Sequence, residues 1–371
     1  MRRASASHGR TVSAGFGLIE LMVAMTLALI LSAATLTLYL NMSRSNSELA
    51  KTNSQMEHGR LAIRLLRDDL MHAGFLDGYL PDFDDLTATS APADYPTVLP
   101  TPCAPYSDWD EPYKTRLLGV PVQLYAAVPS GCTGMMPSPR AGSDVLLVRH
   151  VANCVTGAAN CEADSNGKLY WQTSYCEGEP RYVFDTSGFT LHRRNCTTPA
   201  DKRRFLNTAY YVRDYAVSAG DGIPTLMQSS FDLAGGALVQ RDAVAMVEGI
   251  EAMRFVFGVD NLSDTGAAVD YSQPVQWASA LNRNSPTNRG DGAPDTTCTS
   301  STPCNLADLT NTVVIEVHLL VRNLEPTPGY QSDKTYVVGG ETFGPYNDAF
   351  QRHVYSTTVR LTNVSARRET P

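Results

Sequence analysis

The sequence predicts an α+β protein in which a long N-terminal helix packs on a largely antiparallel β-sheet. An apolar run near the N-terminus continues as an amphipathic helical pattern to about residue 75. Short apolar runs with strand-like alternation then recur between residues 144 and 362. A helix followed by a series of strands is typical of an α+β head. We find no internal repeat.

Composition narrows the possible functions. Among 371 residues, 43% are hydrophobic and 18% are charged, which is ordinary for a folded protein. The mean hydropathy of −0.19 excludes a polytopic membrane protein but allows a single span. The formal net charge is −8. Because binding to phosphate backbones needs a basic excess, we expect no nucleic-acid partner.

The first forty residues predict a membrane anchor. Residues 1–15 contain Arg2, Arg3 and Arg10 and no acidic residue. Phe16 to Leu40 then holds one charged residue, Glu20. A span needs about 20 apolar residues, so residues 16–40 are long enough to cross a bilayer. The basic leader predicts a single-pass topology with a cytoplasmic N-terminus and an external head.

Glu20 is the unusual residue of this span, because a carboxylate in hydrocarbon is unfavourable. Two interpretations are open. A carboxylate near the helix end can reach the headgroup region. Alternatively, Glu20 has a positive partner on a neighbouring subunit, such as a free N-terminal amine.

Residues 15–21, Gly-Phe-Gly-Leu-Ile-Glu-Leu, resemble the cleavage and methylation motif of type IV pilins and type II secretion pseudopilins. The resemblance implies that prepilin peptidase cuts between Gly15 and Phe16 and methylates the new N-terminus of Phe16. It also implies that Glu20 pairs with a neighbour's amine during assembly. Gly17 departs from the family, where Thr is commoner; we expect cleavage nonetheless.

The helical pattern continues through residues 41–75. A narrow apolar stripe recurs every seven residues along this segment and widens from Leu61. The polar side of the helix includes Arg60, Arg64 and Arg67. The stripe consists of Met42, Leu49, Met56, Ile63 and Leu70. Gly74 can end the helix in a left-handed conformation. Residues 59–75 resemble PilW-type minor pilins, with Gly-Arg-Leu-Ala followed by Asp-Leu and Ala-Gly-Phe.

Residues 76–371 form the predicted head. The Pro-rich stretch over 77–115 is predicted to be a long irregular loop. The strand-like runs follow: 144–151, 169–175, 181–184, 205–217, 253–259, 312–323 and 355–362. Val313, Ile315, Val317, Leu319 and Val321 share one face of the clearest strand. Residues 260–311, poor in periodicity, predict a long surface insertion. The segments 247–260, 317–322 and 355–363 also resemble the PilW family.

All eight cysteines lie in the head, which the predicted topology places in an oxidising compartment. An even count favours disulfides among these residues: Cys103, Cys132, Cys154, Cys161, Cys176, Cys196, Cys298 and Cys304. Pairing neighbours in sequence is the simplest of 105 connectivities. Zinc is the rival, but no Cys-x-x-Cys occurs and the histidines do not cluster with the cysteines.

Two further motifs in the insertion have plain interpretations. Asp260 to Gly266 resembles a fragment of a calcium loop but lacks the alternating ligands and later Glu of an EF-hand. A solvated turn is the favoured interpretation, and we expect no metal. Arg289-Gly290-Asp291 is common enough to be only a loop. Hydrolase, zinc-protease and nucleotide-binding motifs are absent, so we expect neither enzyme activity nor a cofactor.

The two resemblances together predict a PilW-type minor pilin of the type IV pilus, residing in the bacterial inner membrane with a periplasmic head and later at the pilus tip. They imply a low-copy priming complex serving adhesion or twitching motility. The implied partners are other minor pilins, the major pilin, prepilin peptidase, the inner-membrane assembly platform and a tip adhesin. A J-type minor pseudopilin of type II secretion is the closest alternative. A membrane-anchored periplasmic enzyme is a remote one.

Overall fold

The computed structural model describes residues 15, 17–279, 281, 283 and 285–369. Contacts divide the chain into two compact units, which meet between Asn53 and Ser54. This boundary falls inside helix α1 (Leu18–His72). The second unit therefore contains the C-terminal part of α1 together with every strand of the described chain.

Helix α1 ends as the sequence predicts. Its last residue is His72, and Gly74 has a φ of 72°, the left-handed conformation expected of a C-terminal glycine. The amide of Gly74 donates to the carbonyl of Arg149 at 2.9 Å. This bond joins the end of α1 to the first sheet.

The first sheet has eight antiparallel strands, five of them in the order β1-β2-β5-β3-β4. β6 pairs with β5, β7 and β8. The strands are β1 (Val122–Tyr125), β2 (Val145–Val151), β3 (Tyr170–Thr173), β4 (Tyr182–Asp185), β5 (Lys202–Arg213), β6 (Thr225–Ala234), β7 (Ala237–Gln240) and β8 (Val244–Glu248).

The second sheet has four antiparallel strands in the order β10-β9-β11-β14, and β14 forms one edge. These strands are β9 (Ile250–Val259), β10 (Thr296–Thr299), β11 (Thr312–Arg322) and β14 (Arg352–Arg360). A separate hairpin joins β12 (Tyr336–Val338) to β13 (Glu341–Phe343). Short helices complete the head: η1 (Asp82–Asp84), η2 (Tyr106–Asp108), α2 (Glu111–Gly119), η3 (Ser130–Cys132), α3 (Leu306–Thr310) and α4 (Thr362–Arg368).

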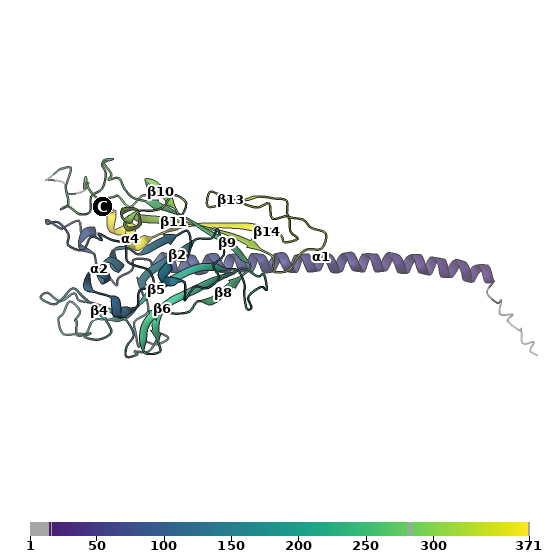
Figure 1. Ribbon diagram of the computed structural model, residues 1–371, viewed down its shortest axis with the longest axis horizontal. Helices are drawn as coiled ribbons and strands as arrows, with labels where there is room; N and C mark the ends of the chain where they lie inside the picture. Colours follow the sequence, from purple (N-terminus) through teal and green to yellow (C-terminus); the bar gives the residue numbers. More distant parts are fainter. Residues whose placement is uncertain (1–14, 16, 280, 282, 284, 370–371) are drawn as a thin grey trace, which may run out of the picture. The chain divides into compact units, whose positions relative to one another are not determined.

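The main core lies between the two sheets, with the C-terminal part of α1 between them (Figure 1). Ala62, Leu66 and Leu70 of α1 are fully buried in it. The predicted inward face of β11 is confirmed, because Val313, Ile315, Val317, Leu319 and Val321 are all buried there. The predicted α+β class, with a helix packed on antiparallel sheets, is therefore correct.

The predicted apolar stripe of α1 coincides only in part with the residues that are buried in the head. Met42 and Leu49 are exposed, and Leu61 is 44% exposed. The buried residues of α1 instead follow spacings of three and four: Gln55, Gly59, Ala62, Leu66 and Leu70. This spacing keeps one face of a helix with 3.6 residues per turn toward a fixed neighbour. A strict period of seven suits only helices that coil around each other.

The prediction of a long surface insertion over 260–311 was also incomplete. Its loops lack regular structure for most of their length, as expected, but β10 and α3 lie near its end. Tyr271 and Arg289 are buried, at 2% and 1% exposure. The Arg289 guanidinium donates to the carbonyls of Asp270 and Gln273, both at 2.7 Å. The insertion is therefore anchored in the head, and Arg289 is not available as part of a surface tripeptide.

Candidate functional site

The predicted processing and assembly residues lie at the start of α1, in the first unit. Phe16 and residues 1–14 are outside the described residues. Gly15 is exposed, and no atom lies within 4 Å of the position that a Cβ would take there. No described residue therefore crowds Gly15.

Glu20 caps the N-terminus of its own helix. Its Oε2 accepts a hydrogen bond from the backbone amide of Gly17 at 3.0 Å. Gly17 precedes the first helical residue, Leu18, so Glu20 occupies the third helical position. This contact is the reciprocal half of a capping box, in which the carboxylate satisfies an amide that the helix leaves unpaired. It also places a negative charge at the positive end of the helix dipole.

The side chains after Glu20 form a long apolar surface. One helix in the described part of the chain, α1, is long and apolar enough to cross a membrane, and its most apolar window has no buried residue. The threonine hydroxyls inside this stretch are satisfied within the helix. Thr26 donates to the carbonyl of Val23 at 2.9 Å, and Thr37 donates to that of Ala33 at 2.8 Å. The surface that this segment presents to lipid or to other helices is therefore mainly apolar.

Gly59 allows the second sheet to approach α1 closely. A Cβ at Gly59 would lie 2.6 to 2.8 Å from three ring atoms of Tyr355 on β14. Four residues earlier, the amide of Gln55 donates to the carbonyls of Val321 at 2.8 Å and Gln351 at 3.1 Å. The start of the 59–75 segment that resembles PilW proteins is thus a packing surface for β11 and β14.

The eight cysteines form four disulfides in the structure, and none is free. Each cysteine is bonded to its nearest predicted partner in sequence: Cys103–Cys132, Cys154–Cys161, Cys176–Cys196 and Cys298–Cys304. The Cys103–Cys132 bond lies in a buried cluster with Met136, Leu147 and Met227. The two cysteine pairs at 154–161 and 176–196 instead close loops near the surface.

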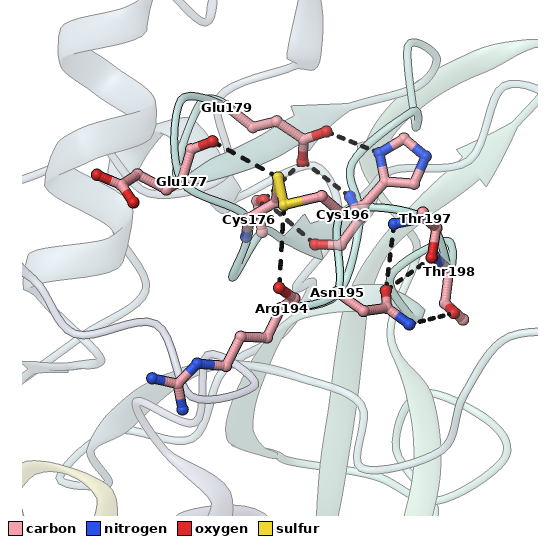
Figure 2. The surroundings of a disulfide bond; sticks show 10 residues. Cys176, Glu177, Glu179, Arg194, Asn195, Cys196, Thr197 and Thr198 are labelled. Carbon is pink, nitrogen blue, oxygen red and sulfur yellow. Dashed lines mark hydrogen bonds and ion pairs between the residues drawn. A yellow bond between two sulfur atoms is a disulfide. The ribbon is translucent and has the colours of Figure 1, made fainter.

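Figure 2 shows the polar groups around the Cys176–Cys196 bond. The Glu179 carboxylate accepts hydrogen bonds from the Ser174 hydroxyl at 2.7 Å and from the backbone amide of His192 at 2.9 Å. The His192 ring nitrogen Nδ1 also lies 2.7 Å from it. The Ser174 bond, followed by those of His192, lowers the pKa of Glu179 to about 2. Glu179 therefore links the two sides of the disulfide-closed loop.

A buried charged cluster joins the insertion to the C-terminal helix. Asp260 is fully buried, and its Oδ2 accepts from the amide of Gly292 at 3.0 Å and lies 3.7 Å from Arg368 Nη1. Arg368 also approaches Asp84 at 3.3 Å and donates to the carbonyl of Thr310 at 3.0 Å. Burial raises the pKa of Asp260 to about 6, although Arg368 opposes this effect. No sequence pattern predicts this cluster, because its members lie far apart in the chain.

This geometry bears on the calcium-like fragment at 260–266. The Asp260 side chain faces Arg368, whereas the Asp264 carboxylate is exposed and accepts from the Ser285 hydroxyl at 2.9 Å. The two carboxylates therefore serve separate contacts. Within the described residues, no group of three or more His, Cys, Asp or Glu side chains could hold a metal ion.

Comparison with known proteins first defines the class. The model of the prokaryotic N-terminal methylation motif matches residues 10–36, which span Gly15, Glu20 and the start of the exposed apolar segment. A chain with this motif and this apolar helix is a prepilin-like protein, consistent with an inner-membrane anchor. We find no match among curated proteins.

The second match concerns the head. The model of type IV pilus-assembly protein W, PilW, matches residues 209–363, from β5 into α4. The two matches confirm the predicted resemblance to PilW-family minor pilins, although residues 59–75 lie outside both. A type IV-like pilin structure from Thermus thermophilus aligns with 83% of this chain and 97% of its own, at 12% identity and a TM-score of 0.32. An alignment with that TM-score is too weak to support a conclusion about this chain.

The matched segment includes Gly249 and Glu251, whose roles the structure explains. Gly249 has a φ of 80°, and a Cβ there would lie 2.8 Å from the carbonyl of Arg322. Glu251 is buried and accepts hydrogen bonds from Arg140 and Arg352, each at 3.1 Å. Both residues therefore hold β9 against neighbouring segments, and neither forms an open site. The match to a pilus-assembly family suggests interaction with other pilus components and a structural role.

Proposed function

We propose that this protein is a minor pilin that acts in a low-copy complex at the tip of a type IV pilus and primes assembly of the filament. The observation that carries the proposal is the exposed apolar start of α1, with one carboxylate at its third position, in a chain that has the methylation motif. Prepilin peptidase removes residues 1–15 and methylates Phe16. The protein then waits in the inner membrane with its head in the periplasm.

Two physical effects favour joining a filament. Burying residues 18–40 against other helices replaces lipid contacts with close packing. Glu20 meanwhile gains a cationic partner, the N-terminal amine of a neighbouring subunit. The Gly17 bond uses one carboxylate oxygen of Glu20, and Oε1 is left to accept from that amine.

The size of the head supports a tip position. Residues 76–371 would crowd a filament if this subunit were repeated along its length. A low copy number avoids that crowding. The partners in such a complex are other minor pilins, the major pilin below it, the inner-membrane assembly platform and a tip adhesin.

An in-frame deletion tests the proposal against its closest rival. We expect loss of pilin sheared from the cell surface, with normal activity of secreted exoproteins. Normal pili with blocked secretion would instead identify a J-type minor pseudopilin. Normal pili and normal secretion, with loss of an enzymatic activity, would identify a membrane-anchored enzyme. Either result would overturn the proposal.

Variants of the motif test the individual steps. Gly15→Asp is expected to leave a chain about 15 residues longer, and equal mobility on a gel would contradict cleavage at this position. Glu20→Gln keeps the size of the side chain but removes its charge. We expect this variant to insert and be cleaved yet fail to co-purify with other minor pilins. Glu177→Gln, at an exposed head position, is the matched control and is expected to assemble normally.

A further inference from the structure

A groove runs between α1 and the edge of the second sheet. It has a volume of about 590 Å³ and lies wholly within the second unit. Leu61, Ile63 and Tyr355 supply its apolar lining, and Arg60, Arg64 and Arg67 supply its basic lining. One wall is therefore a helix face and the other is β14.

The β14 wall is an open sheet edge. β14 pairs with β11 in an unbroken antiparallel register from Arg352 to Arg360. Within the described residues, no strand pairs with its other edge. Proteins normally protect such edges with charged side chains, proline, a bulge, a very short strand, or a covering helix or loop. β14 has no proline, lysine or bulge, and its two arginines stand at its ends, Arg352 and Arg360. Its centre is uncharged and carries Ser356, Thr357 and Thr358.

The helix wall carries an excess of positive charge, with three arginines against Glu57 and Asp68. Arg60, Arg64 and Arg67 are exposed and lie on one helical face, at spacings of four and three residues. Across the described chain, none of the three guanidinium groups has an ion pair within 4.0 Å. Like charges one turn apart repel each other. Glu57 and Asp68 also line the groove but lie at its ends in the helix sequence, so positive charge predominates between them.

We propose that this groove accepts an extended acidic segment of a neighbouring subunit, which adds to β14 as a fifth strand of the second sheet. The main chain of the segment would pair with the open β14 edge. Because side chains alternate along a strand, its acidic side chains could all face the arginines. This inference rests on the proposed function only for the source of the strand, another pilus subunit.

A defined peptide tests the chemistry of the groove. The probe is a nine-residue peptide of alternating Glu and Val with blocked ends, added to the full-length protein in detergent micelles. We expect saturable binding by fluorescence anisotropy, and slower hydrogen exchange confined to residues 352–360. The counterpart with Lys in place of Glu is expected not to bind. Binding without protection of β14 would overturn strand addition, and equal binding of the two peptides would overturn the charge argument.

Charge reversal provides the matched variants. Arg60→Glu combined with Arg64→Glu is expected to weaken binding of the acidic peptide about tenfold or more. Arg194→Glu combined with Arg241→Glu makes the same charge change at exposed positions outside the groove and is expected to leave binding unchanged. Equal losses in the two double variants would overturn the proposal. Arginine-dependent binding of a single-stranded oligonucleotide, without peptide binding, would do the same and indicate a nucleic-acid site.

A crosslink tests the source of the strand. A benzophenone side chain in place of Ser356 is expected to crosslink, in cells, to a co-expressed minor pilin detected by its antibody, and the Arg60/Arg64 variant is expected to lose this product. Absence of any crosslink to a pilin would overturn the assignment of the strand to a pilus subunit. Failure of the proposed function is distinguishable, because normal pili after deletion would leave the peptide result unaffected.

Discussion

Gly59→Ala is the most informative test of how α1 meets the second sheet. An exposed Gly→Ala change inside a helix normally stabilises a protein by about 0.5 to 1 kcal/mol. At Gly59 the new methyl group would lie 2.6 to 2.8 Å from the Tyr355 ring, closer than two carbon atoms can pack. Overpacking costs about 1 to 3 kcal/mol, and the half-buried ring can partly move aside. We expect net destabilisation of about 1 kcal/mol.

The assay is urea unfolding of the full chain in detergent, followed by fluorescence of the tryptophans. Trp171 is fully buried, so its emission reports on unfolding of the head. The second variant is Tyr355→Ala, which removes the obstructing ring. In that background Gly59→Ala is expected to become stabilising, by up to about 1 kcal/mol. This reversal of sign isolates the contact, as a double-mutant cycle does.

Gly134→Ala is the matched control, because no atom lies within 4 Å of its Cβ position. We expect it to be neutral or slightly stabilising in both backgrounds. If Gly59→Ala stabilised the protein while Tyr355 was present, the close approach of β14 to α1 would be refuted. The same effect of Gly59→Ala in both backgrounds would also refute it.

Two further predictions concern the head. Replacing Cys103 and Cys132 by Ala opens a disulfide loop with a sequence separation of 29 and is expected to lower the free energy of unfolding in urea by about 3 to 4 kcal/mol. The same replacement of Cys298 and Cys304, whose separation is 6, is expected to lower it by about 2 kcal/mol. Equal losses would contradict this dependence on loop length. The pKa of Asp260 is raised to about 6, so the folded state holds its proton more tightly than the unfolded state. The stability that this group contributes is therefore fully present near pH 4 and is lost as the pH rises through 6. The expected loss in the free energy of unfolding is on the order of 2 to 3 kcal/mol. Asp260→Asn is expected to lack this fall, and identical pH profiles of the two proteins between pH 4 and 7 would contradict it.

Much of the architecture could be predicted because its signals are local. The inward face of β11 follows from alternation within a single strand, and the end of α1 follows from a glycine two residues past His72. Strands β2, β3, β4, β9 and β14 overlap predicted runs. The predicted strand over 205–217 began too late and ended too far along, because β5 runs from Lys202 to Arg213. The first residues of β5, Lys202 to Arg204, join the sheet because they pair with β3.

Other elements had no readable signal. The strand β8 begins with exposed residues, among them Val244, and β6 has Gln228, Ser229 and Ser230 between its apolar residues. Neither strand therefore shows a clear alternation in its sequence. Helix α2 begins inside a Pro-rich stretch that resembles a loop. Its start depends on Asp110, whose carboxylate accepts from the amide of Tyr113 at 2.7 Å. Such a cap is recognisable only when the helix after it is already suspected.

The sequence by itself determined the long apolar segment, the carboxylate within it, the even number of cysteines in the head and the family resemblance. Each of these depends on residues that are adjacent in the chain, and apolar length or motif spacing has the same meaning in any fold. Only the tertiary structure decided which face of α1 is buried, why Gly59 must be small, and how Asp260 meets Arg368. It also decided that β14 is left as an open edge beside three arginines. Burial, ion pairing and edge exposure depend on segments far apart in sequence, so they become definite only when the sheets close around α1.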